Sequence, residues 1–184
     1  MTDLATRGAP PEFSRPLETS DLEDGDEGNR HLVADDDERA ALRQRFDLLS
    51  LDSLEADLRY RRDGRIVEVA GRLRGELTQT CVVSLEPMAT TVDEQFVRRF
   101  DPDMAPVEDD ELDLTVDDLL DETVCDPLID DTIDLGEVVA EQLGLAIDPY
   151  PRKEGAQIDP RYAASAPEDD DESNPFAVLK KLKL

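Results

Sequence analysis

The sequence predicts an α+β protein: a mainly antiparallel β-sheet built on a long hairpin over about residues 51–81, a third strand, one helix before the hairpin and one after it. Three observations predict this class. Apolar and charged residues alternate on both sides of Asp63-Gly64, and Asp-Gly is a hairpin-turn signal. Two flanking segments have apolar residues at helical spacing instead. The 184 residues, 39% of them hydrophobic, suffice for one small core.

The first helix is predicted over residues 37–47. Three consecutive aspartates, Asp35 to Asp37, suit a helix N-terminus, where carboxylates cap free N–H groups and complement the helix dipole. Leu42 and Phe46 follow one turn apart. The preceding stretch is rich in acids and proline, so we expect residues 1–30 to form an acidic, poorly ordered N-terminal tail.

The hairpin shows the two-residue repeat of half-buried strands. Its predicted buried face comprises Leu54, Ala56, Leu58 and Tyr60 on the first strand and Val67, Val69, Gly71, Leu73, Gly75 and Leu77 on the second. Two glycines on a buried face indicate that something bulky crosses there, such as a helix. Cys81 continues the same parity, which favours a buried structural thiol.

Residues 90–100 fit a helix or a strand, and their β-branched start favours the strand. We expect an acidic loop over residues 101–131, with a short strand near 124–129. The second helix follows Asp134, which with Glu137 makes an acidic variant of the capping box. The apolar stripe of this helix ends before Asp148-Pro149-Tyr150-Pro151, since proline stops helices.

These elements predict a domain over residues 31–152, a flexible linker over 153–173 and a short C-terminal helix or tail over 174–184. Asn174 and Pro175 suit the first positions of that last helix. Because the segment is short and amphipathic, it needs a docking site, either on its own domain or on a partner.

Charge is segregated along the chain. The formal net charge is −27, and residues 101–151 contain 18 Asp and Glu but no Lys or Arg. This excess of negative charge disfavours a protein that clamps nucleic acid and disfavours binding to an anionic membrane surface. It favours binding of a basic partner. Solubility alone is the alternative explanation. The chain has no apolar stretch of about 20 residues and no signal-peptide pattern, so we expect a soluble cytoplasmic protein without membrane contact.

Catalytic and metal-binding patterns are nearly absent from the sequence. There is one histidine, His31, in a polar setting, and two cysteines, too few for the four ligands of a structural zinc site. No glycine-rich phosphate loop or calcium loop occurs. We therefore expect no enzyme activity, no cofactor and no small-molecule substrate.

Arginines cluster in and around the hairpin. They form a candidate RNA-contact set, because arginines on one face can bind phosphates. The alternative is that they pair with neighbouring carboxylates such as Asp57, Glu68 and Glu76. The set is Arg59, Arg61, Arg62, Arg65, Arg72 and Arg74.

Four strings, in this order and spacing, resemble the YceD family of bacteria and plastids, over roughly residues 31–184. They begin at Glu38, at Gln79, at Ile133 and at Asn174. The motif residues, which are also candidates for partner binding, are Gln79, Cys81, Asp134, Gly136, Glu137, Asp148, Pro149, Tyr150, Pro151, Arg152, Asn174, Pro175 and Phe176.

The resemblance implies a factor required for accumulation of large-subunit ribosomal RNA, acting in ribosome assembly. Paired cysteines found in many members are not carried over, because Ser84 stands where a second cysteine would follow Cys81. We therefore expect a non-enzymatic factor that binds ribosomal RNA or a basic ribosomal protein. The alternatives are an acidic chaperone-like module without a specific RNA role and a carboxylate-dependent metal-binding enzyme.

Overall fold

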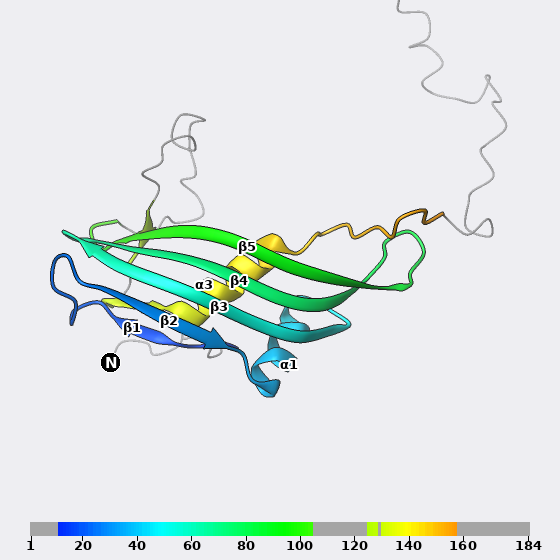
Figure 1. The fold of residues 1–184 in the computed structure, drawn as a ribbon, viewed down its shortest axis with the longest axis horizontal. Helices are drawn as coiled ribbons and strands as arrows, with labels where there is room; N and C mark the ends of the chain where they lie inside the picture. Colours follow the sequence, from blue (N-terminus) through cyan, green and yellow to red (C-terminus); the bar gives the residue numbers. More distant parts are fainter. Residues whose placement is uncertain (1–10, 105–124, 129, 158–184) are drawn as a thin grey trace, which may run out of the picture.

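The computed structural model describes residues 11–104, 125–128 and 130–157. A five-stranded sheet in the order β2-β3-β4-β5-β6 forms the centre, and β1 pairs with β7 in a separate two-stranded sheet (Figure 1). The elements are β1 (Pro16–Glu18), β2 (Glu27–Val33), α1 (Asp36–Arg45), β3 (Ser50–Asp63), β4 (Ile66–Thr80), β5 (Pro87–Asp101), β6 (Asp126–Pro127), β7 (Thr132–Asp134) and α3 (Leu135–Ala146).

The long hairpin is confirmed as β3 and β4, which pair antiparallel from Ser50↔Thr78 to Asp63↔Ile66 around a turn in which Gly64 has a positive φ of 59°. The ambiguous segment 90–100 lies within the strand β5, antiparallel to β4. Among the strands of the described residues, only β6 pairs parallel, with the end of β5. The α+β class, with a mainly antiparallel sheet and a helix on either side of it in the chain, is confirmed.

α3 lies against one face of the sheet (Figure 1). Its apolar stripe, Val138, Val139 and Leu143, is buried together with the predicted inward residues of the hairpin. Of the two glycines on that face, Gly71 allows close approach of side chains, and Gly75 lies at an ordinary contact distance from α3. A β-carbon at Gly75 would lie 3.9 Å from Cδ1 of Leu143, and one at Gly71 would lie 2.9 Å from Cζ of Phe96.

α1 begins with a full capping box. The Asp35 carboxylate accepts from the Glu38 N–H at 2.9 Å, and the Glu38 carboxylate accepts from the Asp35 N–H at 2.9 Å. α1 thus occupies almost the predicted range of 37–47, with Leu42 fully buried and Phe46 as its C-terminal cap.

The N-terminal stretch departs from the expectation of a poorly ordered tail over residues 1–30. From residue 11 onward it belongs to the domain: Phe13, Leu17 and Thr19 are buried, β1 pairs with β7, and β2 starts at Glu27 as an edge strand of the main sheet. The acids and glycines of this stretch do not show the apolar alternation typical of strands. The pairing partners of these short strands also lie elsewhere in the chain, so they were not predicted.

Residues 147–157 leave α3 along the turn that joins β4 and β5 (Figure 1). The predicted C-terminal helix at 174–184, most of the linker and most of the acidic loop 101–131 lie outside the described residues. Within that loop, the short strand expected near 124–129 is β6. No helix among the described residues is both long and apolar enough to cross a membrane.

Candidate functional site

The outer face of the sheet, opposite α3, carries four of the six candidate RNA-contact arginines: Arg59 and Arg61 on β3, and Arg72 and Arg74 on β4. Arg61, Arg72 and Arg74 lie in cross-strand rows that contain acids, because residues directly opposite each other share a face. Arg59 lies between Asn29 and Ala70 instead. One row runs Glu27, Arg61, Glu68 and Arg99. Another runs Glu55, Arg74 and Asp93.

These arginines are mostly paired. Arg72 binds Asp93 through Nε and Nη2, both at 2.5 Å, and Arg59 binds Glu27 at 2.5 Å. Arg74 contacts Glu55 at 3.2 Å and more loosely Asp57. Hydrogen bonding to Arg72 lowers the pKa of Asp93. Among the described residues, Arg61 alone of the four has no bonding partner.

The other two candidate arginines are not on this face. Arg62 donates to the main-chain carbonyls of Thr19, Leu22 and Gly64, tying the N-terminal stretch to the hairpin turn. Arg65 binds Asp101 and Asp103, which flank the end of β5. The structure therefore brings four of the six together and gives the other two structural contacts.

A shallow hollow on the outer face is lined by His31, Asp57, Arg59 and Arg72 around Ala70 and the bare backbone of Gly71. His31 is exposed, and its Nδ1 lies 2.9 Å from Oδ1 of Asp57. This hydrogen bond lowers the pKa of the Asp57 carboxyl. The hollow thus contains both signs of charge.

The motif residues after α3 hold the end of β4. The Gln79 side-chain amide donates to the Asp148 carbonyl at 2.9 Å, and the Val82 N–H donates to the Pro151 carbonyl at 2.9 Å. Pro151 is buried, whereas Tyr150 is 70% exposed. We call residues 148–153 the strap. Two of its main-chain carbonyls and the buried Pro151 hold it against the end of β4, and its other residues, Tyr150 among them, are exposed.

Cys81 lies beneath the strap and is fully buried. Its Sγ accepts the main-chain N–H groups of Lys153 at 3.3 Å and Ser84 at 3.4 Å. These bonds, that of Lys153 first, lower the thiol pKa from 9.0 to about 6, against the opposing effect of burial. No group of three or more His, Cys, Asp or Glu side chains that could hold a metal ion occurs in the described part of the chain.

The motif at the start of α3 also has intramolecular partners. Oδ1 of Asp134 accepts from the N–H groups of Gly136, Glu137 and Arg15, at 3.0, 3.2 and 2.7 Å, and Oδ2 binds the Ser14 hydroxyl. Asp134 thus caps the helix as predicted. Glu137 does not complete a capping box, because its carboxylate binds Arg45 on α1 instead.

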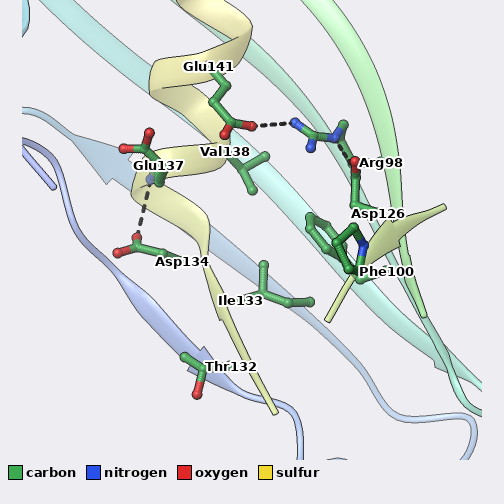
Figure 2. Close-up of a pocket in the computed structure, with 10 residues that line it drawn as sticks. Arg98, Phe100, Asp126, Thr132, Ile133, Asp134, Glu137, Val138 and Glu141 are labelled. Carbon is green, nitrogen blue, oxygen red and sulfur yellow. Dashed lines mark hydrogen bonds and ion pairs between the residues drawn. The ribbon is translucent and has the colours of Figure 1, made fainter. Parts of the chain in front are cut away.

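A groove with a cavity volume of about 310 Å³ lies where α3 passes β5, β6 and β7 (Figure 2). We call it the α3 groove. Its floor is apolar and its rim carries four carboxylates and one guanidinium. The floor is Phe100, Ile133 and Val138, and the charged groups are Asp126, Asp134, Glu137, Glu141 and Arg98.

Arg98 spans the α3 groove (Figure 2). Its Nε binds Asp126 at 2.6 Å and its Nη1 binds Glu141 at 2.7 Å. Burial opposes the charge of Arg98, but these two bonds outweigh it and raise its pKa. One oxygen on each carboxylate, Oδ1 of Asp126 and Oε1 of Glu141, has no bonding partner among the described residues. The rim thus keeps an acidic excess.

Sequence reasoning did not single out Arg98, Asp126 or Glu141. They come from three elements, β5, β6 and α3, whose meeting depends on the single parallel pairing of β6 with Phe100 and Asp101. The sequence feature that could have indicated an acidic rim was the spacing of Asp134, Glu137 and Glu141, which places them on one side of a helix.

The family model described as "Large ribosomal RNA subunit accumulation protein YceD" matches residues 69–183. This range includes β4 from Val69 onward, β5, the α3 groove, α3 and the strap. Searches of curated proteins and of solved structures gave no match.

Proposed function

This chain belongs to the YceD family of large ribosomal RNA subunit accumulation proteins, and we propose that it serves that process by binding a basic protein partner, without catalysing a reaction. The process, accumulation of large-subunit ribosomal RNA, is taken from the description of the family. The contact is our own inference, and the charge distribution of the described surfaces supports it.

One observation carries the choice of partner. The four carboxylates of the α3 groove meet two arginines, Arg98 in the groove and Arg45 beside Glu137, and so keep an acidic excess. The arginines of the outer face stand instead among a similar number of acids. A phosphate backbone would have to displace Glu27, Asp93 and Glu55 from their arginines before binding. A Lys or Arg side chain would find its counter-charge at the groove rim without displacing any group.

The groove also suits such a side chain in shape. Long basic side chains lay their methylene stems on apolar surface and keep the charged head at a polar rim. Phe100, Ile133 and Val138 offer the surface, and the unpaired oxygens of Asp126 and Glu141 offer acceptors. Each rim carboxylate already accepts a hydrogen bond. This arrangement suits the binding of a cation better than proton transfer in acid–base catalysis.

Affinity purification of the full chain from cells, at low and moderate salt, tests the proposal when both RNA and protein are identified. We expect one or a few basic proteins of the large subunit, retained at low salt and lost as salt rises, because screening weakens charge-driven contacts. Crosslinking should place the protein adducts at the α3 groove. RNA adducts at Arg59, Arg72 and Arg74 with no protein adducts would contradict the choice of partner.

The groove itself is tested by the double variant Asp126→Asn/Glu141→Gln, which removes two charges while keeping the shape. It should retain the basic partner weakly. The matched control is Asp52→Asn/Glu76→Gln, which removes two exposed charges outside the groove. Equal retention by both variants would contradict the groove as the contact.

A further inference from the structure

The outer edge of β5 is open over most of its length. In the described part of the chain, only β6 pairs with that edge, at Phe100 and Asp101. The backbone N–H and C=O groups that point away from β4 between Asp93 and Arg99 therefore have no strand beside them among the described residues. A long open edge of this kind is a template for another strand.

The residues along this edge are self-complementary in charge. The seven residues 93–99 read Asp-Glu-Gln-Phe-Val-Arg-Arg, with two acids at one end, two bases at the other and Phe96 at the centre. Two copies placed antiparallel about Phe96 would set Asp93 opposite Arg99 and Glu94 opposite Arg98, on both sides of the two-fold axis.

We propose that a second copy of this chain adds its β5 to this edge, so that two sheets join into one through an antiparallel β5–β5 pair centred on Phe96. Such an interface is isologous, as in most homodimers, because the same patch serves on both copies. The proposal does not require the basic partner proposed above, although its interface reaches Arg98 at the α3 groove.

The charge rows of the outer face support this register. The row Glu27, Arg61, Glu68, Arg99 alternates in sign and ends at the edge with a base, while the row Glu55, Arg74, Asp93 ends with an acid. Joining the copies at Asp93 and Arg99 continues the alternation across the two-fold axis. Arg99 keeps its bond to Glu68 at 3.0 Å and would lie directly opposite the second copy's Asp93, which keeps its own bond to Arg72.

The register also satisfies the strand geometry. Opposite residues must share a face, and 93 with 99, 94 with 98 and 95 with 97 each share one. β6 limits the overlap, because it already occupies the edge at Phe100 and Asp101. On the inner face, the second copy's Glu94 would approach Arg98 beside the α3 groove, and the two Phe96 rings would meet on the axis.

Disulfide trapping tests the register. We expect Gln95→Cys chains mixed with Val97→Cys chains to form a covalent dimer under mild oxidation, because positions 95 and 97 lie directly opposite. Either variant alone places its two cysteines diagonally and should crosslink poorly. A Cys125→Ser background leaves only the buried Cys81. Equal crosslinking in all three samples would overturn the register.

Sedimentation of the full chain tests the dimer itself. The native chain should be dimeric, and Glu94→Arg should weaken association about tenfold or more by facing Arg98 with a like charge, a change of about 1.4 kcal/mol. Glu76→Arg, a reversal of the same kind on β4 away from the edge, should stay dimeric, and both variants should keep the native unfolding midpoint. A monomeric native chain, or a dimer unaffected by Glu94→Arg, would overturn the proposal.

Discussion

Gly136, in the first turn of α3, lies against the main chain of Phe13 so closely that a β-carbon at Gly136 would come within 2.4 Å of the Phe13 carbonyl oxygen. Next to this contact, the Leu135 N–H donates to the Arg15 carbonyl at 3.0 Å. The family-motif glycine is thus explained by packing: the N-terminal stretch crosses the start of α3 where only hydrogen fits.

We expect Gly136→Ala to lower the free energy of unfolding by about 2 kcal/mol, because the added methyl group displaces a buried backbone rather than a movable side chain. Chemical denaturation measures this. Gly144→Ala is the matched control in the same helix, since its β-carbon would meet the half-buried Phe46 ring at 2.9 Å. Helix propensity favours alanine by about 1 kcal/mol, so Gly144→Ala should be close to neutral. Equal losses for both variants would contradict this account of Gly136.

Arg62→Ala should destabilise the protein by about 2 kcal/mol, because charged hydrogen bonds to the partly buried carbonyls of Thr19 and Leu22 are lost. Arg61→Ala should change stability by no more than about 0.5 kcal/mol. Thermal and chemical unfolding of the two variants give the comparison. If Arg62→Ala were as stable as the native chain and instead weakened RNA retention, the RNA-contact interpretation of Arg62 would be favoured.

The lowered pKa of the Cys81 thiol should make the free energy of unfolding depend on pH. Its folded-state pKa, about 6, lies below the ordinary 9.0, so the folded protein favours the thiolate. The resulting stabilisation is complete above the unfolded pKa and is lost as the pH falls through about 6. The difference in unfolding free energy between the native chain and Cys81→Ser should therefore grow from pH 6 to pH 9. Thiolate absorbance of the folded protein should titrate near the lower value; a difference that stays constant over this range would contradict the thiolate.

The hairpin and both helices could be predicted from the sequence because their signals are local. The repeat from Leu54 to Leu77 has a period of two, and Asp35 and Asp134 are recognisable helix caps. Gly71 even indicated the close approach of bulky groups, which are the side chains of Leu58 and Phe96, whereas a β-carbon at Gly75 would be in ordinary contact with Leu143 of α3.

The remaining elements depend on contacts between distant residues. β1 pairs with β7 more than a hundred residues away, and Phe13 is buried against the start of α3. No local pattern distinguishes these few N-terminal residues from a solvated acidic tail. The α3 groove was missed for the same reason, because its Arg98, Asp126 and Glu141 converge only in the folded chain.

The arginines of the hairpin show a further limit. Sequence spacing correctly placed Arg72 and Arg74 on one face, but it left open whether they bind phosphate or neighbouring carboxylates. The structure pairs Arg72 with Asp93 and Arg74 with Glu55, residues on the two adjoining strands. Which carboxylate meets which arginine depends on strand register, and register is fixed by the whole sheet.

The proposed function and its assignment to the α3 groove are tested most directly by the ratio of large-subunit to small-subunit ribosomal RNA. The ratio is measured in cells that depend on a supplied copy of this protein. Depletion should lower the ratio and the native chain should restore it. Asp126→Asn/Glu141→Gln, expressed at the same level, should fail to restore it, while Asp52→Asn/Glu76→Gln should succeed. An unchanged ratio on depletion would contradict the proposed function, and full restoration by the groove variant would contradict the α3 groove as its site.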